Sequence, residues 1–313
     1  MCPVRRAASY DEAMGDDQEL VHYEVADRVA MITLDSQHNR NALSRQLVTE
    51  LFAHLETAAS DDGVVVVLIQ AAGRVFCSGA DLSEASAAGM EEATRRIVDL
   101  QRLIVAMDKP VVTRVAGAVR AGGIGIVAAS DIAIASEDAT FALTEVKLGL
   151  AAAIISLTVH HRMSPRAASL TTLGGEAFDG AAAASYGLVT KAVPAHDLDA
   201  EVGHVCASLS TGAAQGLRES KRLLNADLLA RIDARGEEMS ALSARLFARD
   251  EFIDGDLLSD FFGRIDPVLL PGLLRPGSNH NESMTHLGQV IARSVNAGFG
   301  SMIKLVAPES AST

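Results

Sequence analysis

The sequence is poor in the residues that mark several classes of protein. It contains no tryptophan, only 4% aromatic residues and three cysteines among its 313 residues. The cysteines, Cys2, Cys77 and Cys206, are odd in number and scattered, so they match neither a disulfide framework nor the spacing of a zinc site. We therefore expect no metal centre and a reducing, cytoplasmic environment.

Long apolar segments are also missing. No stretch is apolar over the roughly 20 residues that a membrane-spanning helix needs. The first residues carry Arg5 and Arg6 followed by several acidic side chains, without the apolar segment of a signal peptide. We therefore expect no membrane partner.

Positive charge is in the minority. Lysine and arginine total 27 against 40 aspartate and glutamate residues, which gives a net charge of -13. A nucleic-acid surface needs clustered positive charge to displace counterions, so we expect no nucleic-acid partner. A few local basic side chains can still form a pocket for an anionic small molecule. Apolar residues are abundant, at 49% of the chain, and can form a sizeable core.

Strand-like and helix-like segments alternate through about residue 200. Two β-rich runs read as a hairpin, and a helical repeat follows them with Ser44 as its N-cap. Wholly apolar β-branched runs are typical of strands that are buried on both faces. The alternation predicts an α/β fold with much parallel pairing. The expected strands are 22–25, 29–34, 64–69, 110–115 and 132–135, and the expected helices are 41–59 and about 90–107.

The residue composition and pattern divide the chain into four parts. Residues 1–18 look like a polar arm, and residues 19–200 carry the alternating strands and helices. Alanine-rich helical segments dominate residues 201–264. Prolines and glycines punctuate residues 265–313, which we expect to be a divergent and partly disordered extension.

Two glycine-containing turns are candidates for a ligand site. Residues 75–82 (Val-Phe-Cys-Ser-Gly-Ala-Asp-Leu) follow one expected strand, and residues 117–125, with four glycines, follow another and open a helix. Glycine lets the backbone approach a ligand and direct N–H groups at it, and two such donors suit a thioester oxygen that becomes an enolate. Neither turn has the spacing of a phosphate loop or a dinucleotide site. Taken singly, each is most simply an ordinary tight turn.

Five segments together resemble the crotonase (enoyl-CoA hydratase/isomerase) superfamily in order and spacing. The resemblance covers roughly residues 20–264 and implies the family's spiral of ββα units. It also implies a C-terminal helical region that builds a homotrimer or a homohexamer of two stacked trimers. The five segments are 39–43, 76–82, 109–131, 141–149 and 186–189.

The resemblance implies a site for an acyl-CoA thioester, which is the substrate, with no further cofactor. The backbone N–H groups of Ala80 and Gly122 correspond to the family's oxyanion hole. The remaining expected substrate- or CoA-binding residues are Arg40, Ala42, Leu43, Gly79, Asp81, Leu82, Gly123 and Gly125.

Family hydratases place two glutamates around the substrate double bond, and this sequence has one of them. Glu145 matches the second glutamate, whereas Gly125 stands at the position of the first. An isolated glutamate is usually solvated, but the register of Glu145 with its motif favours a catalytic role. Cys77 is expected in the core, and Asp81 and Asp131 are expected to bond backbone at turns.

Three functions remain open at this point. The first is hydration of a 2-enoyl-CoA, because the sequence around residues 122–131 and 148–156 is similar to a subgroup that hydrates branched glutaconyl-CoA esters and also has glycine at the position of Gly125. The second is isomerisation of a 3-enoyl-CoA to a 2-enoyl-CoA, which needs one base only. The third is a catalytically silent acyl-CoA-binding protein, against which the retained Glu145 counts.

Overall fold

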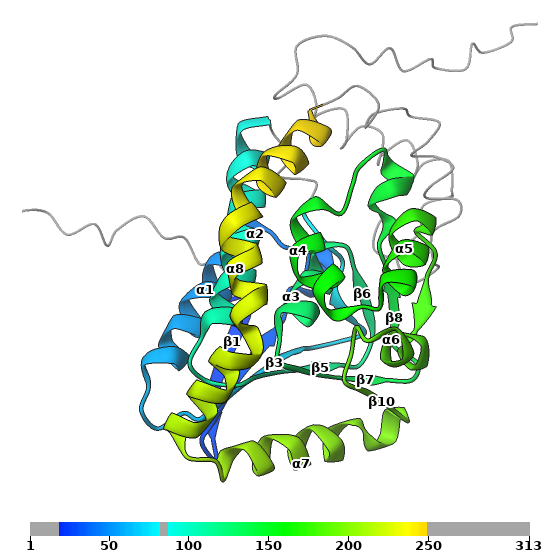
Figure 1. Ribbon diagram of the computed structural model, residues 1–313. Helices are drawn as coiled ribbons and strands as arrows, with labels where there is room; N and C mark the ends of the chain where they lie inside the picture. Colours follow the sequence, from blue (N-terminus) through cyan, green and yellow to red (C-terminus); the bar gives the residue numbers. More distant parts are fainter. Residues whose placement is uncertain (1–18, 82–86, 249–313) are drawn as a thin grey trace, which may run out of the picture.

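The computed structural model describes residues 19–81 and 87–248 (Figure 1). The expected polar arm, Leu82 and the expected extension at 265–313 lie outside the described residues. The described part contains two sheets that are surrounded by helices, and the α/β fold class that the sequence predicts is confirmed.

The larger sheet has six strands in the order β1-β2-β3-β5-β7-β10. Strands β1 and β2 form the expected antiparallel hairpin, in which Asp27 and Arg28 have φ values of 50° and 67°. Two residues with positive φ form the tight turn that matches the twist of the flanking strands. The other neighbours are all parallel. The strands are Val21–Ala26, Val29–Leu34, Val66–Ala71, Val111–Val115, Ile132–Ser136 and Lys191–Val193.

The smaller sheet has four short strands in the order β4-β6-β8-β9. Both glycine-containing segments that the sequence indicated as turns include one of these strands. Residues 75–82 begin with β4, and residues 117–125 contain β6. The sequence did not predict these strands, because strands of two or three residues are too short to show an alternating pattern. The strands are Val75–Cys77, Ala118–Arg120, Thr140–Ala142 and Phe178–Asp179.

The chain builds the two sheets by repeating one unit. Each unit adds a strand to the larger sheet, then a strand to the smaller sheet, and then a helical segment. Strands β3 and β4 precede α2 (Ala87–Ala106), and β5 and β6 precede α3 (Gly122–Ala129). Strands β7 and β8 precede η3 (Thr144–Leu148) and α4 (Ala153–Arg162). This confirms the spiral of ββα units that the resemblance implied.

The remaining helices begin at recognisable signals in the sequence. Helix α1 begins after Ser44, whose side chain accepts a hydrogen bond from the backbone N–H of Leu47 at 3.2 Å, as the sequence predicted. Ser164 and Asp179 cap α5 and α6 in the same way. The bounds are Arg45–Ser60 for α1, Pro165–Gly174 for α5, Gly180–Tyr186 for α6, Leu198–Ser210 for α7 and Ala214–Phe247 for α8, with short 3-10 turns η1 at Gln37–Asn39 and η4 at Ala195–Asp197.

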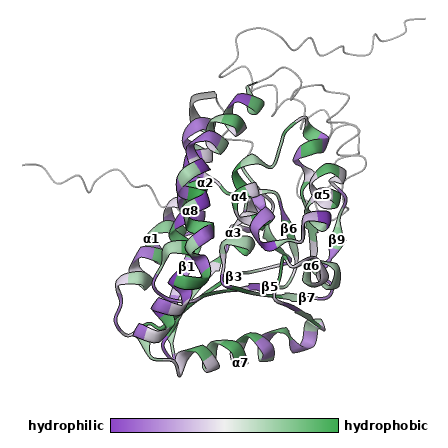
Figure 2. Ribbon diagram, viewed as in Figure 1, coloured by the Kyte–Doolittle hydropathy of each residue, from purple (hydrophilic) through white to green (hydrophobic). Residues whose placement is uncertain are grey.

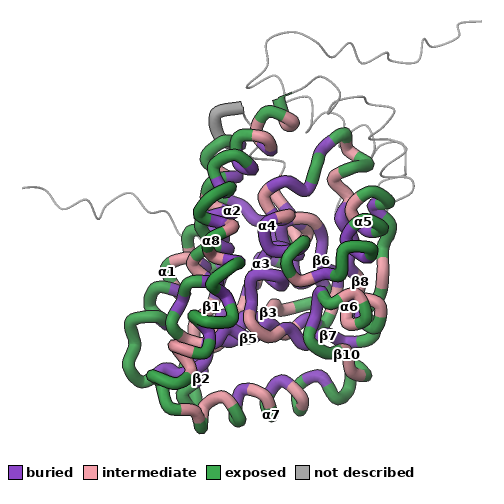
Figure 3. Tube along the Cα trace, in the orientation of Figure 1, coloured by how far each residue is buried: buried purple, intermediate pink, exposed green. Residues whose placement is uncertain are grey.

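Helices cover the larger sheet on both faces. Helix α7 lies along one face, where Leu198, Val202 and Cys206 pack against strand residues such as Val66 and Ile134 (Figure 1). The main core lies on the other face, and Figure 3 shows α3 as a wholly buried helix at its centre. Figure 2 shows that apolar and polar residues alternate along the outer helices α7 and α8. None of the described helices combines the length and the apolar character of a bilayer span.

Asp131 ties the long helix α8 to this core. Its Oδ2 accepts hydrogen bonds from the backbone N–H of Val111 at 2.8 Å and from the ammonium of Lys221 at 2.8 Å. Its Oδ1 accepts from the side-chain amide of Asn225 at 2.7 Å. Lys221 and Asn225 belong to α8 and are only 5% and 3% exposed. The expected structural role of Asp131 is confirmed, and it connects two elements that are far apart in the sequence.

Candidate active site

Three parallel strands of the smaller sheet end side by side and lead into the candidate site. Strand β6 pairs in parallel with β4 on one side and with β8 on the other. Ala80 lies three residues after β4, Gly122 lies two residues after β6, and Glu145 lies three residues after β8. Because the carboxyl ends of parallel strands meet at one edge of a sheet, residues that are distant in the sequence gather there.

Two backbone N–H groups at this edge are available to a ligand. Gly122 is the first residue of α3, so its N–H has no partner within the helix. The N–H of Ala80 donates to no acceptor in residues 19–81 or 87–248. A Cβ at Gly79 would lie 3.0 Å from the Cβ of Ala121, so the two loops that carry these donors touch. Gly79 also has a φ of 99°, which a residue with a side chain rarely adopts.

A third loop, which precedes α1, holds the Ala80 loop in place. The backbone N–H of Leu43 donates to the carbonyl of Gly79 at 2.7 Å, and that of Ser78 donates to the carbonyl of Arg40 at 3.2 Å. The side-chain amide of Asn39 donates to Asp81 Oδ2 at 3.0 Å. The structure therefore brings together the expected CoA-binding residues on the two loops, namely Arg40, Ala42, Leu43, Gly79 and Asp81.

Buried hydrogen bonds fix this third loop to the smaller sheet. Asn41 is 1% exposed, and its side-chain amide donates to the carbonyl of Val75 in β4 at 2.8 Å. Its Oδ1 accepts from the backbone N–H of Ser36 at 2.6 Å. Arg40 and Asn41 both have positive φ values, of 59° and 55°. Non-glycine residues in this region are strained, and the bonds of Asn41 compensate for the strain.

Glu145 combines burial with an unpartnered oxygen. Its side chain is only partly exposed, and its Oε2 has no exposed surface and no hydrogen-bond partner among the described residues. Burial raises the pKa of the Glu145 carboxyl to about 7, although a hydrogen bond from its own backbone N–H offsets part of the effect. A carboxyl group with a pKa near neutrality can both accept and return a proton, as general acid–base catalysis requires.

Gly125 lies one turn into α3, and neighbouring side chains fill the space beside it. A Cβ at this position would lie 2.6 Å from Ile155 Cγ2 and 3.2 Å from Gln101 Oε1. The sequence did not indicate Gln101 or Ile155 as part of the site. Gln101 repeats with Ile97 and Ile104 at helical spacing, so a polar residue on an apolar face of α2 was the signal that could have found it.

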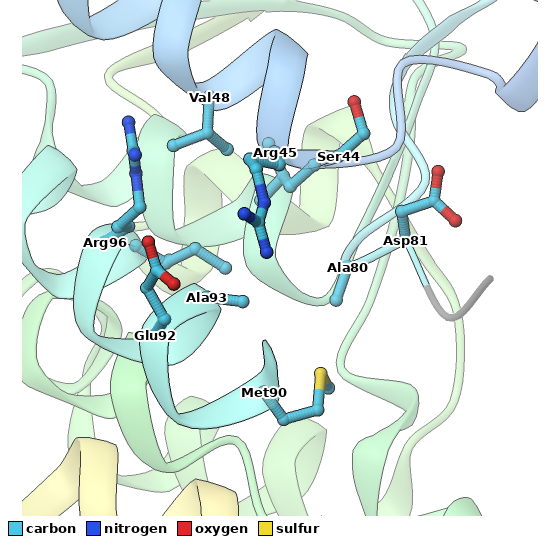
Figure 4. A pocket seen from close by; sticks show the side chains of 11 residues that line it. Ser44, Arg45, Val48, Ala80, Asp81, Met90, Glu92, Ala93 and Arg96 are labelled. Atoms are coloured by element: carbon cyan, nitrogen blue, oxygen red, sulfur yellow. The ribbon is translucent and has the colours of Figure 1, made fainter. Parts of the chain in front are cut away.

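A pocket adjoins the Ala80 loop. It lies between the first residues of α1, the first half of α2 and Ala80, and Figure 4 shows the guanidinium of Arg45 directed into it. The other charged residues that line it are Asp81, Glu92 and Arg96. The described residues contain no group of three or more histidine, cysteine or acidic side chains that could hold a metal. Cys77 is fully buried, which raises the pKa of its thiol to about 12, so its expected place in the core is confirmed.

The ββα spiral and the residues gathered at its strand ends define the class as an acyl-CoA-processing enzyme of the crotonase type. The chain belongs to the enoyl-CoA hydratase/isomerase family, whose model matches residues 24–255.

Solved structures and a curated relative support this assignment. An enoyl-CoA hydratase from Mycobacterium avium is similar at 41% identity and a TM-score of 0.73, over 80% of this chain and 99% of that one. An enoyl-CoA hydratase/isomerase from Xanthobacter autotrophicus shares 26% identity with a TM-score of 0.69, over 81% and 95% of the two chains. The mitochondrial enoyl-CoA hydratase domain-containing protein 3 of Danio rerio is 29% identical, over 70% of this chain and 78% of its own.

Proposed function

We propose that the protein hydrates the 2,3 double bond of a 2-enoyl-CoA, with Glu145 as the single carboxylate that moves protons. The observation that carries this proposal is the buried, unpartnered Oε2 of Glu145 at the strand edge that also presents Ala80 and Gly122. No other cofactor enters the reaction, because the thioester itself activates the double bond.

In the proposed mechanism, Glu145 takes a proton from water as the water oxygen forms a bond to C3. The electron pair of the double bond moves toward the thioester oxygen, which becomes an enolate oxygen. The N–H groups of Ala80 and Gly122 donate to this oxygen, and one such donor is typically worth about 2.7–4 kcal/mol of transition-state stabilisation. Glu145 then returns its proton to C2, which restores the thioester and the carboxylate. Positioned proton transfer of this kind contributes roughly 10²–10⁴-fold to the rate.

A second candidate is the isomerisation of a 3-enoyl-CoA to a 2-enoyl-CoA. In this reaction Glu145 removes a proton from C2, which gives a dienolate whose oxygen accepts from the same two N–H groups, and the proton returns to C4 as the double bond moves to C2–C3. The specific observation in its favour is the lack of a side chain at Gly125, because one base is enough for a proton shuttle.

The acyl group is proposed to be branched and to resemble a glutaconyl ester, on the basis of the sequence around residues 122–131. Turnover of crotonyl-CoA, a 3-enoyl-CoA and 3-methylglutaconyl-CoA by the purified protein tests the proposals together. Loss of the 2-enoyl absorbance with crotonyl-CoA or 3-methylglutaconyl-CoA supports hydration. Its appearance from the 3-enoyl-CoA alone would replace hydration with isomerisation. Binding of all three without turnover would show a silent acyl-CoA-binding protein.

We also propose that the protein assembles as a homotrimer or as a homohexamer. Large apolar side chains stand exposed on α5 and α8, with Leu173 75% and Leu223 79% exposed. Apolar surface of this kind is commonly covered by another subunit. Light scattering at micromolar concentration is expected to give three or six times the mass of 32.8 kDa. A monomer mass would contradict the assembly while leaving the chemistry untouched.

A further inference from the structure

Position 125 is the place on α3 from which a side chain would reach the oxyanion donors. Gly122 and Gly125 are three residues apart, so they lie on the same side of the helix. Side chains on a helix lean toward its N-terminus, and a side chain at 125 would therefore extend toward Gly122. In this protein that space is occupied from the two neighbouring helices, α2 and α4.

Ile155 of α4 blocks the first atom of any such side chain. Its Cγ2 lies 2.6 Å from where a Cβ at Gly125 would be, which is closer than two carbon atoms can approach. Ile155 is 1% exposed, and a β-branched side chain in a helix has essentially one rotamer. The side chain cannot turn away to make room.

Gln101 of α2 fills the same space with a side-chain amide whose hydrogens are both engaged in hydrogen bonds. Its Oε1 lies 3.2 Å from the Cβ position at 125 and accepts a hydrogen bond from the Thr158 hydroxyl at 2.7 Å. Its Nε2 donates to the carbonyls of Ile97 at 3.2 Å and Ile154 at 3.3 Å, so both amide hydrogens are used. Gln101 is 0% exposed. It therefore fastens α2 to α4 across Gly125 and has no donor left for substrate or water.

We infer that Gln101 and Ile155 determine the specificity of the site, because together they close the position from which a second carboxylate would reach the substrate. They restrict the site to reactions that Glu145 can complete alone. The inference rests on the proposed function, in which Glu145 is the proton carrier. The single proton carrier also gives a reason why the space beside Gly125 is filled. A second buried carboxylate would add a like charge and disfavour ionisation of Glu145, which is already disfavoured by burial.

Stability measurements test whether Ile155 blocks a side chain at position 125. We expect Gly125→Ala to lower the urea midpoint clearly in the wild-type background and by less than half as much in an Ile155→Ala background, where Cγ2 is gone. Gly203→Ala is the matched control, because a Cβ at this position in α7 has nothing within 4 Å. It is expected to leave the midpoint unchanged or higher. Equal losses for Gly125→Ala in both backgrounds would overturn the inference.

Kinetics test the restriction to one carboxylate. In an Ile155→Ala background we compare Gly125→Glu with the neutral Gly125→Gln. We expect the Glu variant alone to gain a second ionisation in its pH–rate profile. We also add Glu145→Gln to each of the two variants. The factor by which it lowers kcat should be at least about tenfold smaller in the Gly125→Glu variant than in the Gly125→Gln variant. Identical profiles for the two variants would contradict the inference.

The two tests separate the inference from the proposed function. If the kinetic variants do not fold, the stability comparison decides the question of closure. If the wild-type protein turns over none of the acyl-CoA substrates, the proposed function fails, whereas the coupling between positions 125 and 155 is still measured.

Discussion

Asp131 and Glu145 are both largely shielded from solvent, but their carboxylates have different surroundings. Asp131 accepts three hydrogen bonds, from the Val111 backbone, the Asn225 amide and the Lys221 ammonium, at 2.7–2.8 Å. Glu145 has an oxygen with no partner among the described residues. One carboxylate is fully paired inside the fold, and the other belongs to a residue three positions after β8, whose end lies beside the end of β6.

The comparison shows that the surroundings of a carboxylate decide its role. A paired carboxylate holds its negative charge in one place, so it is useful for joining elements and poor at moving protons. A desolvated carboxylate without a cation beside it has a raised pKa and exchanges its proton readily near neutrality. Removing a neighbour of Asp131 should therefore affect stability, whereas changing Glu145 should affect turnover.

The largest expected effect on stability follows from breaking the Asp131 pair. Lys221→Met removes the ammonium and leaves the partly buried Asp131 carboxylate without the cation that is hydrogen-bonded to it. We expect the free energy of unfolding to fall by about 3–5 kcal/mol, which urea denaturation would measure. Adding Asp131→Asn should recover part of the loss, because the uncompensated charge is gone. A loss below about 1 kcal/mol would show that the pair contributes little.

Glu145→Gln should act on stability in the opposite direction. The folded state raises the pKa of Glu145 from 4.5 to about 7, so ionisation costs the native protein stability as pH rises from 4.5 to 7. Below pH 4.5 both states are protonated and the cost vanishes. We therefore expect Glu145→Gln to be more stable than the wild type by roughly 1–3 kcal/mol at pH 8 and equal to it at pH 4. A variant that is less stable at pH 8 would contradict the burial of the charge.

The smallest effect is expected at a neighbour of Glu145 in sequence. Lys147 forms an ion pair with Glu176 at 2.7 Å, and both side chains are exposed. Exposed pairs are screened by water and salt, and they contribute little. Lys147→Ala should leave the urea midpoint and turnover near the wild-type values. A large loss of turnover would show that Lys147 has a role at the site.

Much of the fold could be predicted from the sequence because its signals are local. The hairpin at Asp27, the cap at Ser44 and the buried β-branched strands all rest on neighbouring residues. The short strands β4, β6 and β8 could not be predicted in this way. Two or three residues carry no periodicity, and these strands exist because they pair with one another in parallel.

The residues of the candidate site also fall into those that sequence motifs indicate and those that depend on tertiary packing. The motifs indicated Ala80, Gly122 and Glu145, and the structure gathers all three strand ends at one edge. The motifs could not indicate Gln101 or Ile155, since these side chains approach Gly125 only through packing between helices. The burial of Glu145 is likewise a property of the tertiary structure.

The most direct test of the account is the turnover of Glu145→Gln across pH. Glutamine keeps the shape of the side chain and removes its basicity. The wild-type kcat on the best substrate should rise with pH through a single ionisation near 7, because the base must be deprotonated. Glu145→Gln should lower kcat by roughly 10²-fold or more, remove that ionisation, and leave acyl-CoA affinity within about threefold. Near-normal turnover with an unchanged pH profile would show that Glu145 is not the group that moves the proton.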